Sequence, residues 1–482
     1  MSFGKKMFHG LAWSAFDRVS MQIVQFLIGI ILARILTPKE YGVMGILLVF
    51  IALANVFIDS GFTKALIQKK DRNKNDISTI FFFNIGISIL CYLLLWFGAP
   101  FISDFYQENS LISFLRVLAL TLLINSIFAV PTTLITIQLD FKTLTKINFI
   151  ATIISGIIAV YLAYTGFGVW ALIIQTLAKS TIMAILVWFY NKWRPSLVFS
   201  RSSFISLFRF GSNILISSLL NTAVNNMSSL FIAKLISTKD LGYYTRGTQF
   251  SDFTFGMVNS IIDRVLLPSL SLVQDQKKIL ISHTRKIIKS TALLVFPIFL
   301  FLTVMAKPLI LLLLTEKWLP AVPIMQLFCL ARMITILSGV NVNLLYVLGR
   351  TDLALKQQYW KIVVRVILLL VALQFGIVYV ALGELISTCI HFFINTYYPG
   401  KFMKYGAFSQ IKDLSKILLA AIIMSIVTYL VSYFIENLIF KLTFASIFAV
   451  ITYYLSIKVL KIPEFKMIVN QSNNFLNPKS KD

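Results

Sequence analysis

Long apolar stretches recur along the whole sequence and constrain its fold more than any other feature. Two of them read ALLVFPIFLFLTVMA (292–306) and VVRVILLLVALQFGIV (363–378). With their flanks they reach the roughly 20 residues that an α-helix needs to cross the hydrocarbon core of a bilayer. Only 13% of the residues are charged, whereas soluble domains carry about a quarter. The sequence therefore predicts an all-α polytopic membrane protein.

The apolar stretches predict about fourteen transmembrane helices joined by short loops. Loops this short leave no room for a soluble domain between the spans. The first span has no small-residue cleavage site, so we expect it to be retained. The expected spans are 11–36, 41–61, 78–100, 111–138, 147–165, 167–190, 204–236, 241–268, 288–314, 322–348, 357–375, 377–398, 412–434 and 438–460.

The basic residues are distributed unevenly among the expected loops. The net charge is +25, from 44 Lys and Arg against 19 Asp and Glu. If the N-terminus is placed in the cytoplasm, most of these bases fall in cytoplasmic loops, such as 64–74 and 277–289. This bias predicts a multi-pass membrane protein with both termini in the cytoplasm. No signature of nucleic-acid binding accompanies the charge, so we expect no nucleic-acid partner.

The sequence contains none of the short motifs that carry catalysis, phosphate binding or metal binding. The three histidines are scattered, at His9, His283 and His391. The three cysteines lie in apolar stretches without paired spacing. We therefore expect no catalytic residue, no metal site and no cofactor, and a protein that is not an enzyme.

One short polar motif occurs once in each half of the chain. ARILTPKEYG occupies 33–42 and AKLISTKDLG occupies 233–242. Two further similar pairs follow in the same order: NVFID (55–59) with NSIID (259–263), and FGVWALIIQTL (167–177) with FGIVYVALGEL (375–385). This order predicts two homologous six-span lobes of the same orientation, related by an axis along the membrane normal. The expected domains are 1–200 (N-lobe), 201–402 (C-lobe) and 403–482 (two added spans and a cytoplasmic tail).

Each copy of the motif also has the composition of a helix start. Thr37 can cap a helix, Pro38 suits the first helical position, and Glu40 suits the first turn. Ser237 and Asp240 repeat this arrangement without the proline. We therefore interpret both copies as joints between helices rather than as ligand sites.

The N-terminal residues carry a family resemblance. GLAWSAFDRVSMQIVQFLIGIILARILTPKEYGVMGILLVFIALANVFIDSGFTKALIQKKD (10–71) resembles the N-terminus of Wzx-type polysaccharide exporters and flippases of the MOP superfamily, in the WzxC/TuaB branch. GFGVWAL (166–172) and the internal repeat fit the same family. The resemblance implies a fourteen-helix, two-lobe transporter of the bacterial cytoplasmic (inner) membrane that moves undecaprenyl-pyrophosphate-linked oligosaccharides from the inner to the outer leaflet. It assigns no residue roles, because the family has no short catalytic signature.

Charges within the expected spans mark candidate sites, because a charge at mid-bilayer is costly. The basic candidates are Arg18, Arg116, Lys179 and Arg332, which would bind a pyrophosphate as bidentate forks or as a point charge. The acidic candidates for a coupling H⁺ or Na⁺ are Asp17, Asp59 and Glu384. For Asp59, near the end of its span, placement at the membrane interface is an alternative.

Polar residues recur on one face of the first helix of each predicted lobe. In the first span, Gln22 and Gln25 follow Arg18 at helical spacing. In the seventh span, Asn221 and Asn225 lie one helical turn apart. Such stripes would line a hydrophilic cavity and bind sugar hydroxyls. Packing between helices through polar residues is the alternative.

The sequence thus favours a flippase that works by alternating access in surface polysaccharide assembly. Its expected partners are a polyprenyl-pyrophosphate-linked oligosaccharide, membrane lipids, and the polysaccharide polymerase and glycosyltransferases of the same pathway. Three alternatives stay open: a cation-coupled drug or metabolite antiporter of the same superfamily, a lipid II flippase, and a membrane-embedded polysaccharide polymerase or ligase. The basic groups in the first half disfavour the antiporter, and the lack of a long outer loop disfavours the polymerase.

Overall fold

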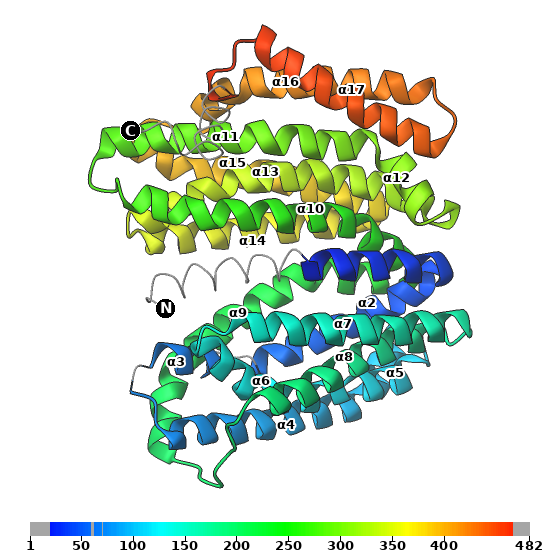
Figure 1. The fold of residues 1–482 in the computed structure, drawn as a ribbon, viewed down its shortest axis with the longest axis vertical. Coiled ribbons are helices and arrows are strands. Elements are labelled where there is room, and N and C mark those ends of the chain that lie inside the picture. The colour runs from blue at the N-terminus through cyan, green and yellow to red at the C-terminus, as the bar shows by residue number, and fades with distance from the viewer. Residues whose placement is uncertain (1–19, 59–61, 70, 466–482) are drawn as a thin grey trace, which may run out of the picture. The chain divides into compact units, whose positions relative to one another are not determined.

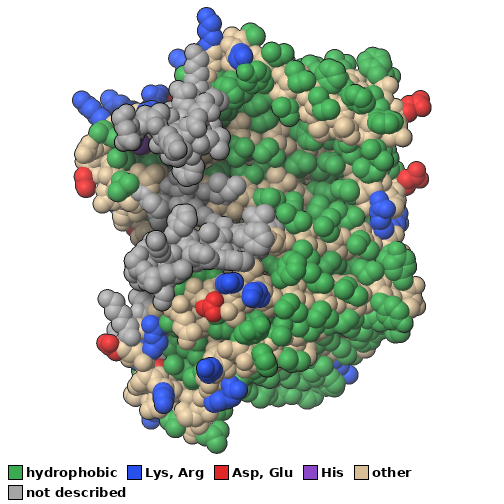
Figure 2. Space-filling model, in the orientation of Figure 1, with side chains coloured by type: hydrophobic (Ala, Val, Ile, Leu, Met, Phe, Trp, Pro, Cys, Tyr) green, Lys and Arg blue, Asp and Glu red, His purple; other side chains and the backbone are tan. Residues whose placement is uncertain are grey.

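The computed structural model describes residues 20–58, 62–69 and 71–465, and every regular element among them is helical (Figure 1). Eleven of these helices are long and apolar enough to cross a membrane. Large apolar side chains lie on their outer faces, including Phe101 (77% exposed) and Phe189 (81% exposed), and hydrophobic side chains cover much of the surface in Figure 2. Such a surface suits lipid rather than water. The prediction of an all-α polytopic membrane protein is confirmed.

The chain divides into two compact units, unit 1 ending at Thr245 and unit 2 beginning at Arg246. Unit 1 contains helix Ser20–Ile35, α2 (Pro38–Ile58), α3 (Phe62–Gln68), α4 (Lys74–Tyr106), α5 (Leu111–Leu118), α6 (Leu120–Ile137), α7 (Phe141–Tyr164), α8 (Val169–Tyr190), α9 (Arg201–Leu235) and the start of α10 (Thr238–Ser271). Unit 2 contains the rest of α10, α11 (Lys277–Val304), α12 (Ala306–Leu313), a 3₁₀ turn (Glu316–Ala321), α13 (Val322–Val347), α14 (Thr351–Ala372), a 3₁₀ turn (Leu373–Phe375), α15 (Ile377–Met403), α16 (Ala407–Tyr433) and α17 (Leu438–Val459).

Three of the fourteen expected spans are not among the eleven apolar helices. One is Ser20–Ile35, whose expected start at residue 11 lies outside the described residues. The other two are α9 and α10, which are 35 and 34 residues long and rich in Asn, Ser and Thr. Their length is sufficient to span a bilayer, but their composition is not that of a lipid-facing helix. The number of fourteen spans therefore stays a prediction.

The two copies of the repeated motif lie against each other in unit 1. Gly42 of α2 faces the carbonyl oxygen of Thr238, and Gly242 of α10 faces the carbonyl oxygen of Pro38. A Cβ atom would lie 1.7 Å from the first oxygen at Gly42 and 1.8 Å from the second at Gly242. Only glycine permits this reciprocal approach of two helix starts. The motif thus occurs twice because each copy supplies half of one contact.

Side-chain caps hold both helix starts in place. The backbone N–H and the hydroxyl of Thr37 donate to Glu40 Oε2 over 2.5 and 2.8 Å. The Ser237 hydroxyl donates to Asp240 Oδ2 over 2.5 Å, and the Asp240 N–H donates to Ser237 Oγ over 3.0 Å. These bonds satisfy N–H groups that a helix start leaves unpaired. The prediction that both copies are helix joints is confirmed.

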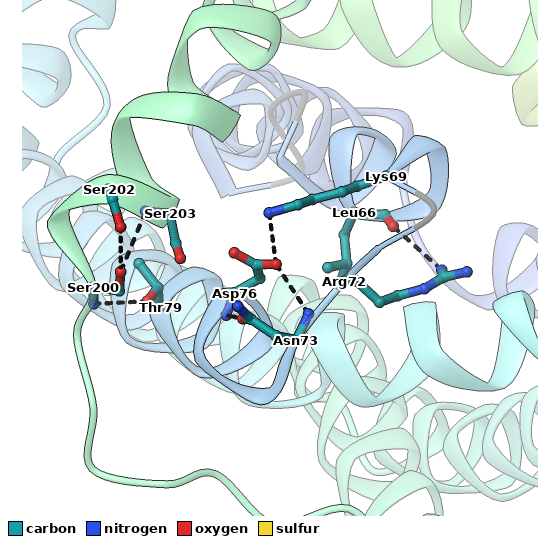
Figure 3. A network of polar contacts seen from close by, with 9 residues as sticks. All are labelled: Leu66, Lys69, Arg72, Asn73, Asp76, Thr79, Ser200, Ser202 and Ser203. Atoms are coloured by element: carbon teal, nitrogen blue, oxygen red, sulfur yellow. Dashed lines mark hydrogen bonds and ion pairs between the residues drawn. The ribbon is translucent and has the colours of Figure 1, made fainter.

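A buried carboxylate fixes the start of α4 (Figure 3). Asp76 is fully buried, and its Oδ2 lies 2.7 Å from the Lys69 ammonium. Asp76 also forms a reciprocal capping box with Asn73, through N–H···O bonds of 3.0 and 2.7 Å. In the same network the N–H of Ser200, the residue before α9, donates to Thr79 Oγ1 over 3.0 Å. The network therefore joins the first turns of α4 and α9.

We expect Gly42→Ala to prevent the close contact of α2 with α10, because the added methyl group meets a backbone oxygen that no rotamer can avoid. The thermal unfolding midpoint of the purified protein should fall by several degrees. The matched control is Gly86→Ala in α4, where a Cβ meets nothing within 4 Å. This control should be neutral or stabilising, by up to about 1 kcal/mol from helix propensity. Equal unfolding midpoints for the two variants would contradict the reciprocal contact.

We expect Asp76→Ala to lower the stability of unit 1 by about 2 kcal/mol or more, because it removes both a helix cap and the partner of Lys69. Chemical or thermal unfolding in detergent measures the loss. Asp352→Ala is the control, since Asp352 pairs with Arg350 at the exposed start of α14. An exposed ion pair contributes little, so the control should unfold like the wild type. An equal effect of both substitutions would show that the buried network adds nothing to the stability of unit 1.

Candidate functional site

Four predicted sugar-binding residues lie on two helices of unit 1. Gln22 is half-buried and Gln25 is exposed on helix Ser20–Ile35. Asn221 and Asn225 are both exposed on α9, and the Asn225 amide donates to Asn221 Oδ1 over 3.3 Å. Their polar groups are thus accessible for hydrogen bonding. Their role in sugar binding stays a prediction.

The basic candidates of unit 1 differ in what they contact. Arg116 of α5 is turned toward α4, with its guanidinium carbon 4.5 Å from the ring centroid of Trp96. Its Nε also donates to the Trp96 carbonyl oxygen over 3.3 Å. Lys179 is half-buried on α8. The remaining candidates of this unit, Asp17, Arg18 and Asp59, lie outside the described residues.

The predicted charges of unit 2 are both held in ion pairs. Arg332 of α13 binds Asp252 of α10 through a 2.6 Å contact between Nε and Oδ1. Glu384 of α15 binds Arg365 of α14 through a 3.1 Å contact between Oε2 and Nε. Each pair joins two helices and reduces the cost of placing its charges in a low-dielectric environment. Any anion at Arg332 or cation at Glu384 would have to share these partners.

A polar pocket of about 340 Å³ lies within unit 2, between α10, α13, α14 and α15. Most of its polar lining consists of hydroxyl and amide groups. The polar residues that line it include Asn259, Thr335, Ser338, Lys361, Thr388, His391 and Asn395. Its volume is within the range of about 300–1,000 Å³ that is typical of small-molecule sites. We call it the polar pocket.

The sequence did not identify Lys361 or His391 as site residues. The span that contains Lys361 was expected to begin at residue 357, which placed the lysine at the membrane edge. In the structure α14 begins at Thr351, so Lys361 lies about 15 Å along the helix. The spacing of Lys361 and Arg365 on one face of α14 was the available signal.

An apolar groove of about 640 Å³ lies in unit 2 along α11, α16 and α17. Its lining includes Leu293, Pro297, Phe301, Ser446, Val450 and Tyr453. Pro297 lies inside α11 and has no N–H for the carbonyl of Leu293, one turn earlier. The Tyr453 hydroxyl donates to that carbonyl over 2.8 Å. The proline thus leaves an acceptor that ties α17 to α11 at the groove, which we call the apolar groove.

The two cavities share one helix. Thr254 of α10 lines the apolar groove, whereas the next residue, Phe255, lines the polar pocket together with Asn259. Unit 2 therefore presents a hydroxyl- and amide-rich pocket and a hydrocarbon-like groove, each of which is lined in part by α10. Within the described residues, no group of three or more His, Cys, Asp or Glu could hold a metal ion.

Comparison with protein families decides the classification. A family model described as "Polysaccharide biosynthesis protein" matches residues 31–323, more than half of the chain. The chain belongs to this family. Among its relatives is "Teichuronic acid biosynthesis protein TuaB" of Bacillus subtilis, 28% identical over 362 residues, which are 74% of each chain. Another is "Lipopolysaccharide biosynthesis protein WzxC" of Escherichia coli, 25% identical over 401 residues, which are 82% of each chain. The predicted resemblance is confirmed.

Solved structures show the fold of this family member. The lipid II flippase MurJ, in an inward closed conformation, aligns with a TM-score of 0.74 at 16% identity, over 93% of this chain and 98% of MurJ. An inward-facing multidrug resistance MATE family transporter of the MOP superfamily aligns with a TM-score of 0.61 at 14% identity, over 82% of this chain and all of the transporter. At such identities the likeness concerns the fold alone. The chain thus has the fold shared by MurJ and MATE transporters.

Proposed function

We propose that this protein translocates lipid-linked oligosaccharides across the cytoplasmic membrane for the assembly of a surface polysaccharide. Membership of the polysaccharide biosynthesis family and the similarity to TuaB and WzxC support the pathway. The fold is one that MurJ, described as a lipid II flippase, also has, so it is compatible with this reaction type. The reaction makes and breaks no covalent bond.

The observation that carries the proposal is the pair of cavities on α10. A lipid-linked oligosaccharide is half hydrocarbon and half sugar, and each half needs its own environment during transfer. The apolar groove offers a surface for the polyprenyl chain, and the polar pocket offers hydrogen bonds to the saccharide. A soluble hydrophilic substrate would have no use for a groove of this size and composition. An amphipathic substrate uses both.

Further parts of the proposal concern topology and driving force. We propose fourteen spans in two lobes, alternating access between the leaflets, and both termini in the cytoplasm. The candidates for binding the pyrophosphate are Arg18, Arg116, Lys179 and Arg332. Outward movement of each negative charge is favoured by roughly 2.3 kcal/mol per 100 mV of a negative-inside potential. The membrane potential then contributes to direction, with H⁺ or Na⁺ at an acidic residue as a supplement.

The antiporter alternative is not supported by a specific observation at the cavities. MATE transporters share the fold, so the fold does not separate the two functions. The ion pair of Glu384 with Arg365 places a base beside the acid that would bind the coupling cation. No specific observation at either cavity favours the polymerase alternative.

The proposal is tested in a strain of the source organism that lacks the protein and is complemented with variants. We expect the deletion to accumulate a complete lipid-linked oligosaccharide in the inner leaflet and to lose surface polymer. Wild-type protein should restore both. Ser446→Trp should fail, because Ser446 is exposed in the apolar groove and the indole would block the lipid chain. Mass spectrometry of extracted lipids gives the readout.

The matched control is Ile447→Trp, at the next residue of α17, which is exposed but does not line the groove. It introduces the same side chain into the same helix and should complement like the wild type. Failure of export in both variants would show that the groove does not hold the lipid chain. A deletion strain with normal polymer and no accumulated lipid-linked sugar would contradict the proposed function itself and favour the antiporter.

A further inference from the structure

Lys361 is a basic residue of the polar pocket that has no acidic partner. It lies inside the span Thr351–Phe375 and is half-buried. Among the described side chains its ammonium takes part in no ion pair, in contrast to Arg332 and Arg365, which are bound by Asp252 and Glu384. A charge within a membrane span is costly and is retained where it meets a partner or a ligand. Among the described residues, the pocket thus carries a positive charge that no acidic side chain pairs with.

The pocket also contains a buried acceptor without a donor. Asn395 is 5% exposed, and its Nδ2 donates to Ser338 Oγ over 2.8 Å. Its Oδ1 accepts no hydrogen bond in the structure. Leaving a buried acceptor without a hydrogen bond costs free energy. Asn395 Oδ1 is out of reach of a water-sized molecule, so a ligand donor would recover this cost once the amide turns toward the pocket.

The hydroxyl groups of the pocket are mainly available as acceptors. Thr335 donates its proton to the Ala331 carbonyl over 2.9 Å, and Thr388 donates to the Glu384 carbonyl over 2.8 Å. Both oxygens therefore keep lone pairs for a donor on the ligand. His391 Nε2 lies 3.0 Å from the Lys361 carbonyl oxygen, which can only accept, so Nε2 carries the proton. In the neutral ring Nδ1 is then another acceptor.

Two requirements follow for an occupant of this pocket. It must donate hydrogen bonds, to satisfy Asn395 and the two threonines, and it must carry negative charge, to pair with Lys361. A metal cation would satisfy the oxygens but would be repelled by the ammonium. A neutral sugar would satisfy the oxygens and leave the ammonium unpaired. A polyhydroxylated anion meets both requirements.

We propose that the polar pocket of unit 2 is a subsite for an acidic sugar, whose carboxylate or phosphate group pairs with Lys361 and whose hydroxyls donate to Asn395, Thr335 and Thr388. The inference rests on the proposed function and deepens it, because it assigns a chemical class to one part of the saccharide. A volume of about 340 Å³ fits a mono- or disaccharide unit rather than a whole oligosaccharide. The pocket then selects substrates by charge.

The test is a binding measurement with soluble probes on the purified full-length protein in detergent. Isothermal titration calorimetry compares methyl glucuronide, glucose 6-phosphate and methyl glucoside, which share a sugar ring and differ in charge. We expect the wild type to bind at least one anionic probe about tenfold more tightly than the neutral probe, a difference of about 1.4 kcal/mol. The stronger of the two anions identifies a carboxylate or a phosphate as the group recognised.

Four variants locate the effect. Lys361→Gln should remove the preference for the anionic probe, and Lys361→Arg should retain it, because the arginine keeps the charge. Lys356→Gln removes a lysine from the exposed part of the same helix and should bind like the wild type. Asn395→Ala should weaken all three probes by a similar factor and leave the preference unchanged. The arginine variant keeps the test valid if the glutamine variant fails to fold.

Equal binding of charged and neutral probes by the wild type would overturn the proposal, as would a preference that persists in Lys361→Gln. These outcomes are independent of transport, since the probes carry no lipid. If the pocket binds acidic sugars but the deletion strain accumulates no lipid-linked oligosaccharide, the proposed function fails and the subsite stands. If the strain accumulates it and the probes do not discriminate, the subsite fails and the proposed function stands.

Discussion

The bilayer interior offers no water, so every polar group of a membrane-spanning chain must find its partner within the protein. The backbone meets this constraint because every regular element of the described residues is helical. Where a proline interrupts the hydrogen bonds of α11, the hydroxyl of Tyr453 replaces the missing donor. Charged side chains meet it through pairs that join neighbouring helices, as Arg332 does with Asp252. The polar groups that do not meet it are therefore informative about ligands.

The two cavities of unit 2 both depart from this rule. Within the part of the chain that the structure describes, the polar pocket has polar groups without partners, and the apolar groove has apolar surface that the protein does not pack. In the polar pocket the Lys361 ammonium and Asn395 Oδ1 have no partner among the described residues, and neither is favourable without a ligand. The apolar groove holds apolar surface open where packing would otherwise close it. Both are built against α10, one of the two long helices whose composition is too polar for a lipid-facing span. The polarity of α10 and the position of the cavities thus have a common explanation.

Much of the fold could be predicted from the sequence, because the constraint acts on composition and on local signals. The apolar stretches predicted the helices, and the capping residues predicted the joints at Thr37 and Ser237. The reciprocal approach of Gly42 to the Thr238 carbonyl and of Gly242 to the Pro38 carbonyl could not be predicted, because it depends on where two distant helix starts meet. The repeat of the motif was visible, but its physical reason was not.

The sites were predicted less well than the fold, because depth in the membrane was judged from expected helix ends. A start at Thr351 instead of 357 moved Lys361 from the edge into the helix. The partners of charges were equally hidden, since pairing across helices leaves no periodic signal in one segment. Arg116 illustrates this, because its stacking on Trp96 joins residues from two helices. Sequence identified Arg332 and Glu384, which the structure shows to be paired, but it missed Lys361.

The most direct test of the account is translocation by the purified protein in vesicles. Liposomes that contain the protein would be loaded with a fluorescent polyprenyl-pyrophosphate oligosaccharide, and a membrane-impermeant quencher would report its leaflet. The account predicts protein-dependent movement between leaflets that accelerates when a potential favours transfer of the negative charge and stops in Ser446→Trp. Movement that is no faster than in protein-free vesicles, at every potential and cation gradient, would contradict it.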